Sequence, residues 1–419
     1  MDASRCRSCS NSTGVPGPEQ PSVRRAGTEN FPVMSNAGSA ASRPRTGEPP
    51  PLDFAACRRH IAEICALPST GPTVGAEVEW LVVDSADVGT RPSVEDLQEL
   101  LGTVEFPGGS RLTYEPGGQL ELSGPPGCTA VEAVDPIRAD FAAVEQALAS
   151  RGWRVDGRAY DDRREARRVN GLARYGEMEK WFSEGGWSTA PQMMCNTAAV
   201  QVNVGCGPDP ALTWKRANRM AAPLAAAFAA SPGGDWASCR LKAWAGLDPS
   251  RTRSAFSTGD PVDDWTAYAM SAKAMLRQGA DGIRRIPCGP SFSEWVEGVT
   301  LPDEPPTLAD FDLHLSTLFP PVRLKGWIEL RVFDLPSHDD WPVPVAVTAA
   351  LLTGDELEGE ESLLAPVNGV DWTEAARSGL NDAALRAAAQ ALIDAAISRL
   401  AGEGNPLAAQ VSAWAGRCL

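Results

Sequence analysis

Long apolar segments are missing from this sequence of 419 residues. No stretch approaches the roughly 18 consecutive apolar residues that a membrane-spanning helix needs. The first residues also lack the apolar core, about 7–15 residues long, of a secretory signal peptide. We therefore expect a cytoplasmic protein with reduced thiols and no membrane partner.

Several sequence signatures of common binding and catalytic sites are also missing. The 10 cysteines are too few and too irregularly spaced for a disulfide scaffold. Neither a double C-x-x-C pattern nor H-E-x-x-H occurs, which argues against a zinc site. There is no G-x-x-x-x-G-K-[ST] loop, no G-x-G-x-x-G after a predicted strand and no G-x-S-x-G. The sequence thus excludes a Walker-type nucleotide site and argues against a Rossmann-type one.

Basic residues are scarce relative to acidic ones, with 38 Lys and Arg against 54 Asp and Glu and a net charge of −16. Nucleic-acid-binding proteins usually carry a basic face, and anionic membranes attract basic segments. We therefore expect small-molecule ligands and no nucleic acid. An acidic protein that binds an anion needs local arginines or a metal ion to do so.

Composition separates a tail from an ordered region. Residues 1–50 are rich in Ser, Gly, Pro and Arg and show little hydrophobic periodicity, which predicts a disordered segment. Residues 51–419 show no repeat and no Pro/Gly-rich linker, so we predict a single domain there. The sequence leaves the oligomeric state open and is compatible with a monomer.

Hydrophobic periodicity predicts an α+β fold in which helices pack on one face of an antiparallel sheet. The predicted strands cover residues 73–84, 111–115, 119–123, 197–204 and 327–333. A turn at Pro116-Gly117-Gly118 joins the second strand to the third. The predicted helices cover residues 54–67, 94–101, 129–150 and 210–229, and an Ala-rich helical region follows Trp372.

Carboxylates gather on one face of these predicted strands. Side chains alternate along a strand, so Glu77 and Glu79 share a face. The hairpin places Glu115 and Glu121 on one face as well, because cross-strand neighbours point the same way. The same alternation places five further residues on the polar side of the sheet: Thr197, Gln201, Asn203, Glu329 and Arg331.

A solvated polar face is the ordinary explanation for such alternation. Here the clustered glutamates argue against it, because like charges repel and Glu is a poor strand former. A cation between the carboxylates would remove the repulsion, and oxygen ligands suit Mg²⁺. The sequence therefore predicts a carboxylate-lined Mg²⁺ site. Arg240, Arg251 and Arg331 are suited to anionic substrates, although each alone also fits a structural ion pair.

Six motifs, in order along the chain, resemble those of plant-type glutamate–cysteine ligases. Residues 74–79, VGAEVE, are similar to the family's G-x-E-x-E strand, and LTYEPGGQLELSGP at 112–125 is similar to its EPGGQ-x-ELSG segment. The other matches are Arg174-Tyr175 with Met193–Asn203, Phe228–Pro232, Arg240–Thr252 and His314–Arg331. The segment MMCNTAAVQVNVG is most similar to an actinobacterial branch whose γ-glutamylcysteine is used in ergothioneine synthesis.

The resemblance implies a glutamine-synthetase-like fold, in which a curved antiparallel sheet forms a funnel with helices on its outer face. It implies that residues 51–419 are a catalytic domain that joins the γ-carboxylate of glutamate to the amine of cysteine through a γ-glutamyl phosphate. ATP is the implied co-substrate and Mg²⁺ the implied cofactor. The implied metal-binding positions are Glu77, Glu79, Glu115, Glu121, Gln201 and Glu329.

Other roles concern the substrates. We expect Arg331 and Glu329 to act in catalysis, with Arg331 stabilising the transferring phosphoryl group. We expect Arg240 to bind the α-carboxylate of glutamate. Thr197, Asn203 and Arg251 are the remaining predicted substrate contacts.

Three alternatives stay open. The first is a carboxylate–amine ligase of the same fold that joins glutamate to another amine. The second is a non-catalytic regulatory relative, which should have lost the carboxylates that this sequence keeps. The third is a guanidino-type phosphotransferase, which would release a phosphorylated product rather than an amide and phosphate.

Overall fold

An antiparallel sheet forms the centre of the computed structural model, which describes residues 52–65, 73–279, 281–337 and 339–419. The strands follow the order β2-β3-β1-β5-β9-β8, and β4 pairs with β1 beyond the part that β3 covers. A separate hairpin consists of β6 (Leu276–Gly279) and β7 (Gly282–Arg285). The main sheet contains β1 (Val74–Asp84), β2 (Arg111–Tyr114), β3 (Leu120–Ser123), β4 (Trp153–Asp156), β5 (Ala199–Val204), β8 (Val322–Leu324) and β9 (Ile328–Asp334).

The α+β class and the antiparallel sheet are thus confirmed, and all five predicted strands are present. The predicted strand over 197–204 begins later, at Ala199. The Thr197 hydroxyl donates to the carbonyl of Met193 (2.8 Å), and the Ala198 amide donates to that of Ala159 (2.9 Å). The two short strands β4 and β8 were not predicted, because three or four residues are too few to reveal alternation.

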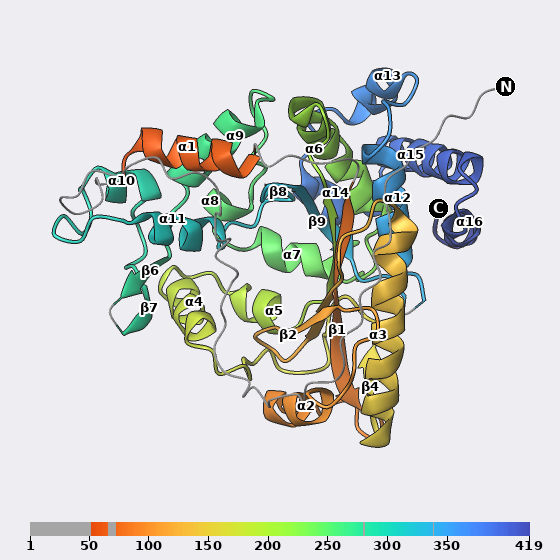
Figure 1. Ribbon diagram of the computed structural model, residues 1–419, viewed down its shortest axis with the longest axis horizontal. Helices are drawn as coiled ribbons and strands as arrows, with labels where there is room; N and C mark the ends of the chain where they lie inside the picture. The colour runs from red at the N-terminus through yellow and green to blue at the C-terminus, as the bar shows by residue number, and fades with distance from the viewer. Residues whose placement is uncertain (1–51, 66–72, 280, 338) are drawn as a thin grey trace, which may run out of the picture. The chain divides into compact units, whose positions relative to one another are not determined.

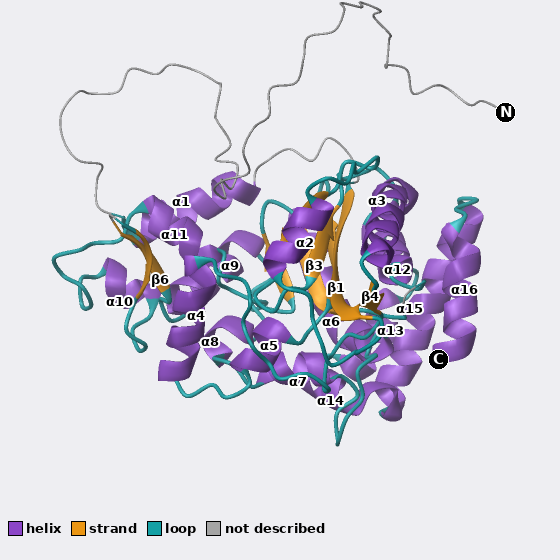
Figure 2. Cartoon of the chain, turned by 90° about the horizontal axis from the view of Figure 1, so that it is seen from below, coloured by secondary structure: helices purple, strands orange, loops and turns teal. Residues whose placement is uncertain are grey.

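Three helices cover the apolar face of the sheet: α3 (Ala130–Ser150) packs on β1, α6 (Pro210–Ala227) on β9, and α12 (Pro342–Leu352) on β5 and β1. Outside them lie α15 (Ala383–Gly402) and α16 (Leu407–Cys418) (Figure 2). Every residue of α12 is buried. A helix that is apolar on all sides has no amphipathic pattern, so sequence periodicity did not reveal it.

The opposite side of the sheet faces α5 (Ala190–Cys195) and α7 (Cys239–Ala245), whereas α3 and α12 lie beyond β1 (Figure 1). Helix α7 contacts α5, α14 and β9 directly. This side carries the polar face of the strands. The fold therefore buries one face of the sheet under helices and leaves the other to form a site.

The remaining helices surround this core. They are α1 (Phe54–Cys65), α2 (Val94–Leu101), α4 (Ala173–Glu184), α8 (Pro249–Thr252), α9 (Pro261–Ser271), α10 (Phe292–Val296), α11 (Leu308–Leu315), α13 (Glu360–Leu364) and α14 (Trp372–Ser378). Side-chain caps at Ser93, Thr129 and Asp209 fix the starts of α2, α3 and α6 close to their predicted positions. Within the described residues, none of the helices combines the length and apolarity needed to cross a bilayer.

Two sequence expectations fall partly or wholly outside the described residues: the 1–50 tail and the last two residues of the helix predicted over 54–67. The described residues themselves all belong to one structural unit. The extent of the catalytic domain and the disorder of the tail stay predictions.

The β2–β3 turn is anchored to α5 by a close backbone approach. A Cβ atom on Gly117 would lie 2.2 Å from the carbonyl oxygen of Cys195, so only glycine fits there. Gln119 accepts from the Gly117 amide (2.9 Å) and donates to the carbonyls of Met194 (3.2 Å) and Thr197 (3.0 Å). The turn, with Glu115 at its start, is therefore held against the end of α5.

His314 provides a test of the packing by pH. Its Nε2 donates to the carbonyl of Ala269 (2.9 Å), its ring stacks on Phe292, and Nδ1 is buried without a partner. Burial, helped by nearby Arg251, lowers the pKa of His314 from 6.5 to about 3. Below pH 6.5 the unfolded chain binds a proton that the folded chain cannot, so this group makes stability fall as pH decreases.

We expect the free energy of unfolding to fall between pH 7 and pH 5.5 by about 1 kcal/mol more in the wild type than in His314→Gln. Urea unfolding at both pH values measures the difference. Equal pH dependence in the two proteins would contradict a neutral, buried His314.

Candidate active site

Five carboxylates project from neighbouring strands on the polar face of the sheet. In the antiparallel register Glu79 lies opposite Glu121, and Glu121 lies opposite Thr113 across the hairpin. On the other side of β1, Glu77 lies opposite Gln201, and Asn203 lies opposite Glu329 of β9. The structure thus brings the predicted metal-binding residues together from β1, β3, β5 and β9 and from the turn after β2.

Neutral donors bind three of these carboxylates. Gln201 Nε2 donates to Glu79 Oε1 (3.0 Å), and Asn203 Nδ2 donates to Glu77 Oε1 (3.3 Å). Glu121 Oε1 accepts from the hydroxyls of Thr113 (2.9 Å) and Ser123 (3.2 Å). These bonds fix the orientation of the carboxylates without neutralising their charge.

The crowding has an electrostatic cost. Burial is the main cause of raised pKa values in three of these carboxylates, and the charge of Glu121 is the next. The pKa of Glu77 is raised, that of Glu79 is raised to about 7, and that of Glu115 is raised well above its usual range. These carboxylates are therefore held where their ionised forms lack sufficient compensation. A bound cation would supply it.

Glu329 has the opposite surroundings. Arg323 donates to it through Nε (2.5 Å) and Nη2 (2.9 Å), Lys325 Nζ lies 3.3 Å away, and Arg331 Nη1 lies 3.1 Å away. Burial opposes the charge of Glu329, but these three cations outweigh it and hold the pKa well below its usual range. Glu329 is therefore a permanent anion at the edge of the cluster.

The chemistry of the donors fits Mg²⁺, which prefers carboxylate and amide oxygens and keeps several waters. Among the described residues, no three carboxylates, histidines or cysteines are already gathered at ion-binding distances. A bound ion would therefore have to draw the side chains of Glu77, Glu79, Glu115 and Glu121 inward. The raised pKa values of Glu77, Glu79 and Glu115 show that their ionised forms lack a compensating charge, so binding a cation would favour this movement.

A small cavity beside the carboxylates is lined by two arginines and by Leu241, Trp244, Phe319 and Trp372, among others. The guanidinium of Arg331 lies over the rings of Trp244 (5.5 Å) and Phe319 (5.8 Å), and its Nη1 donates to Gln201 and Glu329. Arg240 donates from Nη2 to the carbonyl of Arg331 (3.0 Å).

Arg240 is only 2% exposed, yet its Nε and Nη1 have no hydrogen-bond partner. Its nearest anion is Asp334, whose Oδ1 lies 3.6 Å from Nη1. Asp334 itself accepts from Ser231 (2.7 Å) and Ser238 (2.8 Å). Buried unsatisfied donors are costly, so Arg240 presents two open donor positions for an anionic ligand.

Two predicted substrate contacts are engaged elsewhere. Arg251 is fully buried, donates to Thr317 and to the carbonyl of Lys273, and lies 3.5 Å from Asp248. Its guanidinium also lies over Trp181 (4.7 Å). The hydroxyl of Thr197 is bonded to Met193 at the end of α5. These contacts favour structural roles for both residues.

Comparisons with known proteins bear on what this arrangement does. The profile of glutamate–cysteine ligase family 2 matches residues 73–417. The chain belongs to this family. It is 36% identical over 395 residues to the glutamate–cysteine ligase EgtA of Mycolicibacterium smegmatis, covering 90% of this chain and 89% of that protein. It is also 36% identical over 370 residues to the EgtA of Mycobacterium tuberculosis (strain CDC 1551 / Oshkosh), covering 84% of each.

Among solved structures, a glutamate–cysteine ligase from Francisella tularensis in complex with AMP has a TM-score of 0.50 with this chain. The alignment covers 82% of each chain at 14% identity, so it supports the shared fold. The predicted family and fold relationship are confirmed. The funnel formed by a curved sheet stays a prediction. Among the described residues the main sheet is not closed, because it ends at the edge strands β2 and β8.

Sequence reasoning missed the basic partners of Glu329 in this family member. Arg323 and Lys325 are two residues apart and precede Gly326-Trp327. Their spacing is the alternation of a strand, but β8 has only three residues. The family segment His314–Arg331 included both residues, so the resemblance gave the only signal for them.

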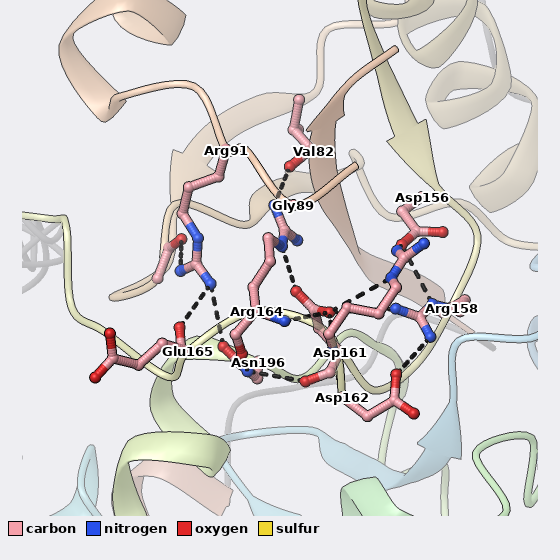
Figure 3. Close-up of polar contacts among 12 residues, drawn as sticks. Val82, Gly89, Arg91, Asp156, Arg158, Asp161, Asp162, Arg164, Glu165 and Asn196 are labelled. Carbon is pink, nitrogen blue, oxygen red and sulfur yellow. Dashed lines mark hydrogen bonds and ion pairs between the residues drawn. The ribbon is translucent and has the colours of Figure 1, made fainter. Parts of the chain in front are cut away.

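A second polar network includes Arg91, Arg164 and Asn196 (Figure 3), and Arg91 connects it to the hairpin turn. Arg91 donates to the carbonyls of Gly117 (2.9 Å) and Glu165 (3.2 Å) and to Asn196 Oδ1 (3.2 Å). Asn196 in turn donates to the carbonyls of Asp161 and Arg164, both at 2.8 Å. This network joins the turn that carries Glu115 to the segment before β5, and so fixes two sides of the site.

The ion pair of Arg323 with Glu329 is buried on both sides, which predicts a large effect on stability. Arg323→Gln leaves a buried carboxylate less compensated and should lower the free energy of unfolding by about 3 kcal/mol or more. Arg58→Gln removes an exposed ion pair with Asp263 and should leave stability almost unchanged. Urea unfolding of both variants checks this, and equal losses would contradict the assignment.

Proposed function

We propose that this protein is an ADP-forming glutamate–cysteine ligase that makes γ-glutamylcysteine in the cytoplasm for ergothioneine synthesis. The observation that carries the proposal is the juxtaposition of the carboxylates with the two arginines of the cavity. The two EgtA relatives, which this chain matches over most of their length, are named as glutamate–cysteine ligases. The proposed ligands are glutamate, cysteine, ATP and Mg²⁺, with residues 51–419 as the catalytic domain of a funnel-like fold.

In the proposed reaction, the γ-carboxylate of glutamate attacks the γ-phosphorus of ATP, releasing ADP and forming a γ-glutamyl phosphate. The amine of cysteine then attacks the acyl carbon, forms the amide and displaces inorganic phosphate. Phosphoryl transfer depends on positioning and charge neutralisation more than on a covalent nucleophile. This explains why the site contains carboxylates and arginines rather than an activated serine or cysteine.

The surroundings of the side chains support the following proposed roles. The residues that would hold Mg²⁺ are Glu77, Glu79, Glu115, Glu121, Gln201 and Glu329, and the ion would neutralise phosphate charge when bound. Arg331, which contacts Gln201, Glu329 and two aromatic rings, is the proposed contact for the transferring phosphoryl group. Arg240, with its open donors, is the proposed contact for the α-carboxylate of glutamate. Asn203 is a further proposed substrate contact.

The first test is turnover of ATP with glutamate, Mg²⁺ and each of several amines, followed by mass spectrometry of the products. We expect one ADP and one phosphate per γ-glutamylcysteine, and faster product formation with cysteine than with any other amine. A different preferred γ-glutamyl amide would replace the substrate but keep the reaction class. A phosphorylated product without phosphate release would favour a phosphotransferase, and no product at all would favour a regulatory relative.

The second test removes one charge from the carboxylate cluster. Glu121→Gln keeps the shape of the side chain and its bonds to the Thr113 and Ser123 hydroxyls, so the fold should be retained. We expect kcat/KM to fall by about 100-fold or more, because the cation would lose an anionic ligand. Glu95→Gln, on the exposed first turn of α2, is the matched control and should be fully active. Normal activity of Glu121→Gln would refute the metal assignment.

A further inference from the structure

Trp327 is an exposed aromatic residue in the turn between β8 and β9. Lys325 donates from its amide to the Trp327 carbonyl (2.9 Å), and Gly326 between them has a positive φ of 82°. Trp327 is 37% exposed and is one of the few exposed large apolar residues in the described part of the chain. Core packing therefore does not account for a tryptophan at this position.

Two side chains of the carboxylate cluster nevertheless hold the indole in place. Trp327 Nε1 donates to Asn203 Oδ1 (3.0 Å), and Asn203 donates to Glu77 (3.3 Å). Lys325 Nζ lies 5.3 Å from the centroid of the indole ring and 3.3 Å from Glu329 Oε1. The ring is thus fixed at the edge of the site, two hydrogen bonds from a proposed metal-binding carboxylate.

The sheet register places this ring and the arginine cavity at opposite ends of the carboxylate cluster. Glu77 and Glu79 are about 6.6 Å apart along β1. Glu79 is bonded to Gln201, which is bonded to Arg331 at the cavity. Glu77 is bonded to Asn203, which is bonded to Trp327. The polar face therefore runs from the arginines, through the carboxylates, to the indole.

We propose that the indole of Trp327 is the surface on which the purine base of the nucleotide stacks. This inference rests on the proposed function: glutamate occupies the Arg240 end, and the reacting phosphate lies at the carboxylates. The remainder of the nucleotide then extends toward the other end, where the exposed ring and the ammonium of Lys325 lie. An aromatic ring binds a base by stacking, and the neighbouring cation attracts the phosphates.

Calorimetric titration of the whole chain with a non-hydrolysable ATP analogue in the presence of Mg²⁺ tests the proposal without turnover. Tripolyphosphate, which has no base, is the second probe. We expect Trp327→Ala to bind the analogue about tenfold more weakly and tripolyphosphate as tightly as the wild type. Trp327→Phe keeps a ring but loses the bond to Asn203, and it should bind the analogue within about threefold of the wild type.

Trp236→Ala is the matched control, because Trp236 also has a cation, Arg377, 5.0 Å from its ring centroid but does not line the site. It should bind both probes normally, and urea unfolding should show that all variants fold. Unchanged affinity of Trp327→Ala for the analogue would overturn this inference but not the proposed function. The same holds if Trp327→Ala and Trp327→Phe lose equal affinity for the analogue, or if Trp327→Ala loses affinity for tripolyphosphate to the same extent. A wild type that binds neither probe would overturn the proposed function as well.

Discussion

Repulsion among buried carboxylates is the constraint on which the rest of the site depends. Glu77, Glu79 and Glu115 surround Glu121, and their pKa values are raised because burial and mutual charge oppose ionisation. The fold tolerates this arrangement by giving the nearby Glu329 three cations and by binding the other carboxylates with neutral amides and hydroxyls. The charge that is left unbalanced is what a divalent cation would neutralise.

The scaffold explains why these side chains stay in register. A slip of one residue would move every side chain of a strand to the other face. The helices α3, α6 and α12 bury the opposite face, where Val74, Ala76, Val78 and Trp80 alternate with the glutamates of β1. Burial of the apolar face thus fixes the position of the catalytic face. The Gly117 turn and the Arg91 network then hold the hairpin against α5.

Much of this architecture could be predicted from the sequence, because alternation in the longer strands assigns each side chain to a face. The shared face of Glu77 and Glu79, and that of Glu115 and Glu121 across the hairpin turn, followed from that pattern, whereas the pairing of Glu79 with Glu121 across β1 and β3 is a finding of the structure. The pairing of Glu329 with Arg323 could not be predicted, because β8 is too short to show a period. Nor does the sequence distinguish Arg240, which has two buried donors without a partner, from Arg251, which has one and is otherwise bonded to residues 273 and 317 and paired with Asp248. Such differences depend on tertiary contacts.

The most direct test of the central claim is a crystal structure with Mn²⁺ in place of Mg²⁺, together with glutamate and a non-hydrolysable ATP analogue. Mn²⁺ accepts similar oxygen ligands, and its anomalous scattering identifies its position. The account predicts an anomalous peak bounded by carboxylates of Glu77, Glu79, Glu115 and Glu121, with these side chains drawn inward. Ordered nucleotide and glutamate without a peak there, or with Mn²⁺ bound elsewhere, would contradict it.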